Sequence, residues 1–289
     1  MSQRNCDGEI AGAGGDAAPV GALGSVIGSI VAESPLIEVA GSTRILTRPR
    51  SVGSMLVFVD YEHASRYESG SLNERNDTDW LLAARTRITY RLEDLSGRHC
   101  MLVRYDRITP ELLERLGVEA IFISGQGTNP AKYRAADTAT FAEIIRTSGL
   151  PVFGFCGGWQ FMAGCFGSDL VRIEVPEEHK DDDIITEWPG GRIAEYGYYP
   201  VDIADRSHPL LEGLSDAPTF RHAHGLHIPN PPDGFQPLAS TPVTPVQMAV
   251  DDDRRMVGTQ FHPEYWTDEH PDGRQMIANF LRWAGVTAC

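Results

Sequence analysis

One stretch of the sequence, residues 151–160, holds a cysteine in a setting that suits a nucleophile. An apolar run leads into glycines 154 and 158 on either side of Cys156, and a helix-like segment, residues 159–166, follows at once. This order is typical of a nucleophile elbow, a tight turn between strand and helix where a Cβ two positions from the apex would clash. The partial positive charge at the start of the helix favours thiolate over thiol. We therefore predict that Cys156 is an exposed nucleophile at the top of a sheet.

A histidine and a carboxylate near the other end of the chain could serve that cysteine. His262 and Glu264 are two residues apart, and in an extended segment residues i and i+2 point to the same face. Pro263 between them biases His262 toward the extended conformation. A thiol nucleophile needs a proton acceptor, and a third group usually orients that acceptor. The sequence therefore predicts a triad of Cys156, His262 and Glu264, with the histidine as base.

These residues must be positioned by a fold, and the first part of the chain predicts alternating strands and helices. Apolar runs predict strands at residues 55–59, 99–105, 120–123 and 151–155, and periodic segments predict helices at residues 77–95, 109–116 and 136–147. Such alternation indicates an α/β fold with a doubly wound, mostly parallel open sheet. Ligands of such sheets bind at the carboxyl ends of the strands, where Cys156 and the loop of residues 124–130 are expected.

The pattern changes after Ser168 to shorter strands with turn signals between them. Residues 169–175 and 193–203 are predicted strands, and we expect them to form an added antiparallel portion packed on the same core. The chain then returns to the main sheet at residues 256–261, which delivers His262. A helix at residues 273–283 ends the predicted fold.

The composition predicts one domain over residues 51–289, after a variable, partly disordered extension over residues 1–50. The extension is rich in Gly, Ala and Ser and has no aromatic residue. The formal net charge of −15 argues against a nucleic-acid partner, because phosphate binding requires clusters of Lys and Arg. The apolar stretch at residues 20–32 is short and interrupted by Gly and Ser, so we expect neither a membrane span nor a signal peptide.

The cysteines and histidines suggest neither a disulfide framework nor a metal centre. The five cysteines form no CxxC pair, which fits a reducing cytoplasm, and Cys100 and Cys165 are expected to be small core residues. His222, His224 and His227 form a cluster whose loop has no nearby set of carboxylates. We therefore expect a structural or pocket-lining role for these histidines and no metal or cofactor.

The two motifs, taken with several others, resemble those of class I glutamine amidotransferase domains. The resemblance extends over about residues 54–283 and rests on these segments: Gly154–Gln160, Phe261–Glu264, the loop after Ser124, Glu195–Gly197, His208–Gly213, His224–Gly225 and Asn279–Leu281. It implies hydrolysis of the side-chain amide of glutamine. In that family the ammonia is usually handed to a synthetase domain or subunit. No Gly-rich phosphate loop with a lysine occurs in this chain, so we expect the synthetase to be a separate protein.

Amide hydrolysis by a thiolate needs donors for the oxyanion that forms. We expect one backbone N–H from Gly157, just after the nucleophile, and another from the loop of Gly125, Gln126 and Gly127. The family commonly has a second glycine followed by proline in this loop, and this chain departs from that pattern at Gln126-Gly127. A γ-glutamyl thioester on Cys156 is the implied intermediate.

Three further residues are expected to contact the substrate. Gln160, one helical turn after Cys156, resembles the family residue that helps to hold the glutamine portion. Trp159 stands where a smaller or polar side chain is more usual, so we expect it to narrow the pocket. His224 is expected to line the pocket.

Three other functions must be weighed against the amidotransferase. A γ-glutamyl hydrolase or peptidase on the same fold would act on a larger γ-glutamyl conjugate, because a scaffold does not fix its substrate. An α/β-hydrolase is disfavoured by the order of the triad. In that fold the acid comes well before the histidine in the sequence, whereas here Glu264 follows His262 by two residues. A catalytically silent regulatory or binding subunit is disfavoured because all three triad residues are present.

Overall fold

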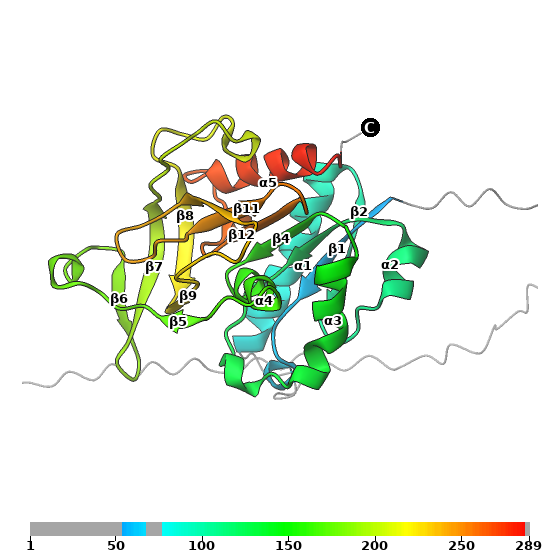
Figure 1. Cartoon of the computed structure of the whole chain (residues 1–289), viewed down its shortest axis with the longest axis horizontal. Helices are drawn as coiled ribbons and strands as arrows, with labels where there is room; N and C mark the ends of the chain where they lie inside the picture. The colour runs from blue at the N-terminus through cyan, green and yellow to red at the C-terminus, as the bar shows by residue number, and fades with distance from the viewer. Residues whose placement is uncertain (1–53, 68–76, 287–289) are drawn as a thin grey trace, which may run out of the picture. The chain divides into compact units, whose positions relative to one another are not determined.

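The structure is a computed structural model that describes residues 54–67 and 77–286 (Figure 1). The predicted extension over residues 1–50 lies outside these residues, so its boundary stays a prediction. A seven-stranded sheet forms the centre, in the order β10-β11-β12-β4-β3-β1-β2. Its strands are β1 (Met55–Asp60), β2 (His99–Arg104), β3 (Val118–Ile123), β4 (Val152–Phe155), β10 (Gln236–Ala239), β11 (Met248–Asp251) and β12 (Met256–Thr259).

The strands that carry the predicted chemistry are parallel neighbours. β4 pairs in parallel with β3 on one side and with β12 on the other, whereas β10 and β11 are added antiparallel to β12. The carboxyl ends of β3, β4 and β12 therefore meet at one edge of the sheet. This order brings together the loop after Ser124, Cys156 and His262, which are far apart in the sequence, and it confirms the predicted α/β sheet.

Helices cover both faces of the sheet. They are α1 (Asp77–Ser96), α2 (Pro110–Leu116), α3 (Ala135–Thr147), α4 (Gly157–Cys165) and α5 (Asp272–Trp283). Leu56 and Phe58 of β1 belong to the hydrophobic core that includes α1 and α5, whereas Val57 and Val59 belong to the core that includes α2, α3 and α4. Since successive side chains of a strand point to opposite faces, the two cores lie on opposite sides of the sheet. The sheet is thus doubly wound, as predicted.

The antiparallel portion is also present, with shorter strands than predicted. β6 (Ile185–Trp188), β7 (Arg192–Pro200) and β8 (Thr219–His224) form one sheet, at the left of Figure 1, and β5 (Val171–Arg172) pairs with β9 (Leu226–His227). The strand predicted at residues 169–175 shrinks to two residues because the strand with which it pairs, β9, is equally short. Residues 54–67 and 77–286 also form five 3-10 helices: η1 (Ala64–Arg66), η2 (Pro130–Lys132), η3 (Glu177–His179), η4 (Pro209–Leu211) and η5 (Pro263–Tyr265).

Within residues 54–67 and 77–286, no helix is both long enough and apolar enough to cross a bilayer.

Candidate active site

Cys156 lies at the apex of the turn between β4 and α4, in a backbone conformation that few residues adopt. Its φ of 48° and ψ of −106° are unusual for a residue with a Cβ. A Cβ at Gly154 would lie 2.8 Å from the carbonyl carbon of Gly158, and one at Gly158 would lie 2.5 Å from the carbonyl oxygen of Ile123. The predicted nucleophile elbow is therefore confirmed, and its glycines are required by close approach of the backbone.

The expectation that Cys156 is exposed is wrong. Only 5% of the residue is accessible, because the turn is packed between β3 and β12. Its side chain opens instead onto a cavity of about 370 Å³. A buried thiol that is reached only through a cavity is protected from bulk solvent and from large oxidants, while small substrates still reach it.

His262 and Glu264 are paired as predicted, but through a different local structure. Nδ1 of His262 lies 2.7 Å from Oε1 of Glu264. The two residues do not lie on one extended strand, because Pro263 begins the 3-10 helix η5 and Glu264 lies within it. The backbone N–H of His262 donates to the carbonyl of Arg221 at 2.8 Å, which ties the histidine to β8.

The environment of His262 favours its protonated form. Burial opposes the charged imidazolium, but the carboxylate of Glu264 and the side chain of Cys156 outweigh it, and the pKa of His262 is raised to about 10. A Cβ at Gly125 would lie 2.7 Å from Cε1 of His262 and 3.5 Å from Cβ of Cys156. The imidazole and the cysteine therefore share the space that the missing side chain of Gly125 leaves open.

The other two cysteines of the described residues differ from Cys156 in their surroundings. Burial raises the pKa of the Cys100 thiol to about 12 and that of the Cys165 thiol to about 11. Both are free of disulfides. Since the thiolate is the reactive form, burial makes these two cysteines poor nucleophiles at neutral pH.

The loop after β3 packs against the start of α4. A Cβ at Gly157 would lie 2.8 Å from the backbone nitrogen of Gln126, so the two peptides are neighbours. The expectation for Gly127 as an oxyanion donor is wrong, because its N–H already donates to Oε2 of Glu62 at 2.7 Å. Gly125, Gln126 and Gly157 keep their predicted role as a proposal.

Glu62 was not among the residues that the sequence pointed to. It lies two residues beyond the end of β1, beside the end of β3, and only 2% of it is accessible. An acidic residue just after a buried parallel strand falls at the edge of the sheet where ligands bind, and that position was the available signal.

The cavity in front of Cys156 contains two of the three predicted substrate contacts. It is lined by Gln126, Gly127, Thr128, Asn129, Pro130, Cys156, Gln160, Leu170, Arg172, Trp188, Arg192, Ala223, His224, Gly225 and Leu226. Gln160 is held in place by hydrogen bonds from its Nε2 to the carbonyl of Leu226, at 3.0 Å, and to Oε1 of Gln260, at 3.2 Å. The binding roles of Gln160 and His224 stay predictions.

Trp159 does not line this cavity, and the expectation that it narrows the pocket is wrong. Its indole is fully buried in the hydrophobic core that includes α2, α3 and α4, beside Phe235. It occupies the space above Gly258 of β12, where a Cβ would lie 1.9 Å from the indole ring. A large side chain is tolerated after the elbow because the neighbouring strand has a glycine at the point of contact.

A second cavity, of about 230 Å³, shares Gln126 and Gly127 with the first. Glu62, Trp80, Arg85, Arg221 and Tyr265 contribute to its lining. His262 and the segment Gly125–Gly127 do so as well. The loop therefore borders both the cavity at Cys156 and a cavity that reaches His262.

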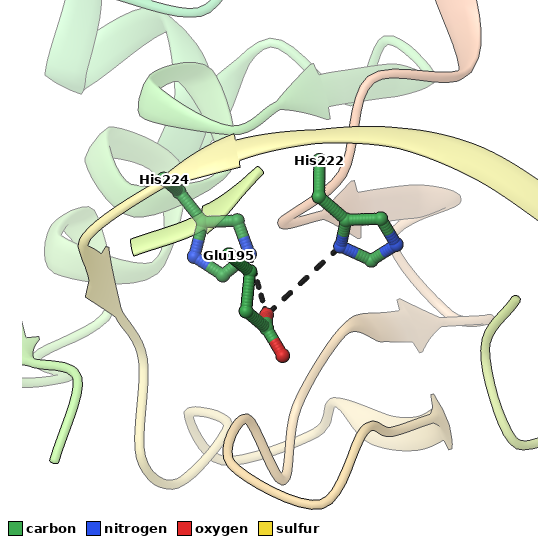
Figure 2. Close-up of side chains that lie close together, drawn as sticks. All are labelled: Glu195, His222 and His224. Carbon is green, nitrogen blue, oxygen red and sulfur yellow. Dashed lines mark ion pairs between the residues drawn. The ribbon is translucent and has the colours of Figure 1, made fainter. Parts of the chain in front are cut away.

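Behind the first cavity, His224 is paired with a buried carboxylate (Figure 2). The strands β7 and β8 place Glu195 opposite His224, and Nε2 of His224 lies 2.9 Å from Oε2 of Glu195. Nδ1 of His222 lies 3.9 Å from the same oxygen. The expectation that no carboxylate lies near these histidines is therefore wrong. Glu195 is distant from them in the sequence and reaches them because β7, which carries it, pairs with β8.

These three residues have the side-chain types of a metal centre, and their ligand atoms lie within 4.8 Å of one another. The carboxylate of Glu195, however, also accepts hydrogen bonds from Thr241, Thr244 and Gln247. Burial opposes ionisation of Glu195, but hydrogen bonding and charge from His224 outweigh it and lower the pKa of the carboxyl to about 2. With its lone pairs occupied by protein donors, Glu195 is better explained as the centre of a hydrogen-bond network, and we assign no ion to it.

The structure shows an α/β fold with a strained cysteine at the turn between β4 and α4, beside a buried histidine–glutamate pair. Comparison with known proteins places the chain in a family. The family model for glutamine amidotransferase class-I matches residues 82–283. The chain belongs to this family.

Among curated proteins, a glutamine-hydrolyzing GMP synthase of Symbiobacterium thermophilum is 33% identical over 165 residues, which is 57% of this chain and 28% of that protein. The chain thus spans less than a third of the length of the curated relatives that it matches.

Solved structures support the fold. A protein from Thermoplasma acidophilum, described as a proposed component of a GMP synthase, aligns with a TM-score of 0.57 at 23% identity, over 80% of this chain and 94% of its own. A glutamine amidotransferase from Methylobacillus flagellatus aligns with a TM-score of 0.52 at 14% identity, over 81% of this chain and 95% of its own.

Proposed function

We propose that this chain hydrolyses the side-chain amide of glutamine through Cys156, His262 and Glu264. The observation that carries the proposal is a strained elbow cysteine that lines a cavity and has a buried histidine–glutamate pair beside it. Membership of the glutamine amidotransferase class-I family supports it. The roles of the single residues follow from their geometry and their charge.

In this proposal the cysteine and the histidine form a thiolate–imidazolium pair before substrate binds. The carboxylate of Glu264 holds the proton on His262, whose pKa is raised to about 10. The thiolate attacks the amide carbon, and the carbonyl electron pair moves to oxygen. When the tetrahedral species collapses, the C–N bond breaks, and the nitrogen takes the proton of His262 and leaves as ammonia. A γ-glutamyl thioester remains on Cys156.

Water then completes the cycle with the same residues. Neutral His262 takes a proton from water as the water oxygen attacks the thioester carbon. The C–S bond breaks, glutamate leaves, and the thiolate–imidazolium pair is restored. The backbone N–H groups of Gln126 and Gly157 are proposed to stabilise both oxyanions, because they lie beside each other next to the elbow.

We further propose that the ammonia passes to a separate synthetase that also activates the hydrolysis. The matched curated relatives are named glutamine-hydrolyzing GMP synthases, and this chain aligns with 28% of their length. Free release of ammonia would waste glutamine, so we expect the isolated chain to be a weak glutaminase. The partner is proposed to contact the rim near residues 124–133 and 229–237, above the carboxyl ends of the strands. Ammonia release with and without a candidate synthetase tests this: hydrolysis at the full rate without a partner would contradict it.

A γ-glutamyl hydrolase is the second candidate, and one observation favours it. The cavity that begins at Cys156 is also lined by Arg172 and Arg192, whose positive charges could hold an additional carboxylate of a larger γ-glutamyl conjugate. The values of kcat/KM for glutamine and for γ-glutamyl dipeptides separate the two candidates. A higher value for glutamine supports the amidotransferase, and a higher value for the dipeptides supports the hydrolase.

A further inference from the structure

The loop that follows Ser124 is held by a buried carboxylate. Oε2 of Glu62 accepts the N–H of Gly127 at 2.7 Å, and Oε1 accepts the N–H of Thr128 at 3.2 Å and that of His63 at 3.0 Å. Hydrogen bonds from backbone N–H groups to an ionised acceptor are among the stronger ones in proteins. Glu62 therefore fixes two successive peptides of the loop.

The loop is also held by a buried guanidinium. Arg85 of α1 donates from one terminal nitrogen to the carbonyl of Gly125 at 2.7 Å, and its Nε lies 2.9 Å from Oδ1 of Asp60. Both charged side chains are almost fully buried, at 3% and 5% exposure. Asp60 in turn ends β1, so this contact ties the loop to the central sheet.

These contacts set the direction of one peptide in particular. A trans peptide is planar, and its C=O and N–H point in opposite directions. Because Arg85 holds the carbonyl of Gly125, the N–H of Gln126 in the same peptide must point away from Arg85. That nitrogen lies beside Gly157 at the start of α4, next to the elbow. The orientation of the proposed oxyanion donor is thus set by the guanidinium of Arg85, which does not line the cavity at Cys156.

We propose that Glu62 and Arg85 are positioning residues that hold the loop from Gly125 to Thr128 in the orientation that stabilises the oxyanion. This inference rests on the proposed function. Glu62 is the better residue to test, because Glu62→Gln keeps the shape of the side chain. An amide cannot accept from Gly127 and Thr128 with both of its ends, since its NH₂ group would face one of these N–H groups. One of the two peptides after Gln126 would then rotate, and because the chain is continuous this rotation would displace the adjoining Gly125–Gln126 peptide, which carries the proposed donor.

A buried carboxylate that binds backbone N–H groups can also be purely structural, and the chain offers a matched control. Asp272 of α5 is buried and accepts the N–H of Ser215 at 2.8 Å and that of Thr219 at 3.0 Å. It lines neither the cavity at Cys156 nor the cavity that reaches His262. Asp272→Asn therefore removes the same kind of contact at a distance from the site.

The experiment compares wild type, Glu62→Gln, Glu62→Asp and Asp272→Asn by three measurements. These are kcat and KM for glutamine, the rate at which iodoacetamide alkylates Cys156 as followed by peptide mass spectrometry, and the midpoint of thermal unfolding. Alkylation displaces iodide and forms no oxyanion, so it reports the Cys156–His262 pair alone. Loss of one oxyanion donor lowers kcat about 10²- to 10³-fold in enzymes that use this device.

For Glu62→Gln we expect kcat to fall about 100-fold or more, with KM and the alkylation rate close to those of wild type. Glu62→Asp keeps the charge on a shorter side chain, so its kcat should lie between those of wild type and Glu62→Gln. This variant also provides the test if Glu62→Gln does not fold. Asp272→Asn should lower the unfolding midpoint and keep kcat.

Two results would overturn the inference. The first is a Glu62→Gln variant with the kcat of wild type. The second is a parallel loss of kcat and alkylation rate in both Glu62 variants, which would indicate a general structural role. A wild-type chain that releases no ammonia and forms no γ-glutamyl thioester would overturn the proposed function and this inference with it.

Discussion

Two buried histidine–glutamate pairs lie near the cavity, and they differ in what else the carboxylate contacts. Glu264 accepts from His262 through Oε1, and its Oε2 has no hydrogen-bond partner among residues 54–67 and 77–286. Glu195 pairs with His224 at a similar distance, but it also binds Thr241, Thr244 and Gln247. A carboxylate with one partner acts on the proton of that partner, whereas one with four partners holds several strands together.

From this difference we infer a catalytic role for the pair at Glu264 and a structural role for the pair at Glu195. The pair at Glu264 stands beside Cys156 and raises the pKa of His262. The pair at Glu195 joins β7 and β8 to the segment that leads into β11, and its second histidine, His222, has its pKa lowered to about 3 by burial above all and then by the neighbouring His224. We therefore expect substitutions in the first pair to change catalysis and substitutions in the second to change stability.

The largest effect in this comparison is expected for His262→Ala. This variant loses both the partner of the thiolate and the proton for the leaving nitrogen, so kcat for glutamine should fall by about 10⁴-fold or more. The measurement is steady-state ammonia release. The matched control is His224→Ala, in the other pair, which should retain a far higher kcat. Equal losses of kcat in the two variants would contradict the different roles of the two pairs.

The next largest effects are expected for substitutions of the two glutamates. Glu264→Gln should lower kcat by about 10³-fold, less than His262→Ala, because an orienting residue contributes less than the base. Glu195→Gln should leave kcat within about threefold and lower the free energy of unfolding by about 2 to 4 kcal/mol, because it removes a buried carboxylate that accepts several hydrogen bonds. Chemical denaturation together with turnover checks both. A Glu264 variant that is slower than the histidine variant would contradict these roles.

A smaller effect concerns the pH dependence of stability. His262 has a folded-state pKa of about 10 and an unfolded value near 6.5, so its stabilising contribution is full below about pH 6.5 and is lost as pH rises toward 10. Wild type should therefore lose stability over this window, and Glu264→Gln should lose less of it because the carboxylate that raises the pKa is absent. Urea unfolding at a series of pH values measures the two slopes. Parallel slopes would show that Glu264 does not hold the proton.

The smallest effect is expected in the core behind the elbow. Gly258→Ala places a Cβ against the indole of Trp159, within 1.9 Å of the ring in the present arrangement. Overpacking of this kind costs about 1 to 3 kcal/mol, and kcat should change little because the indole does not line the cavity. Thermal unfolding and turnover test this. A variant with unchanged stability and an altered KM for glutamine would indicate that Trp159 contributes to the substrate pocket after all.

The sequence predicted the features that depend on local patterns. The elbow around Cys156 was predictable because glycines at fixed spacing mark close backbone approach, and the strand–helix alternation from Met55 to Cys165 marks a parallel sheet. The pairing of His262 with Glu264 was also predictable from spacing, although the 3-10 turn that joins them was not.

The features that depend on distant contacts were not predictable in the same way. Glu195 meets His224 only through the register of β7 with β8, and Glu62 meets Gly127 only because β1 and β3 are neighbours. Trp159 was misplaced for the same reason, since the space that it fills is created by Gly258 on another strand. Such contacts depend on strand order and register, which a local pattern does not specify.

The central claim is that Cys156 forms the γ-glutamyl thioester, and direct detection of that species tests it. The protein is mixed with glutamine, quenched in acid within the first turnover, digested and analysed by mass spectrometry, with Cys165→Ala as the control for the other cysteine of α4. We predict a γ-glutamyl adduct on the Cys156 peptide in wild type and in Cys165→Ala, and no adduct or ammonia release in Cys156→Ala. An adduct on Cys165, or continued ammonia release by Cys156→Ala, would contradict the mechanism.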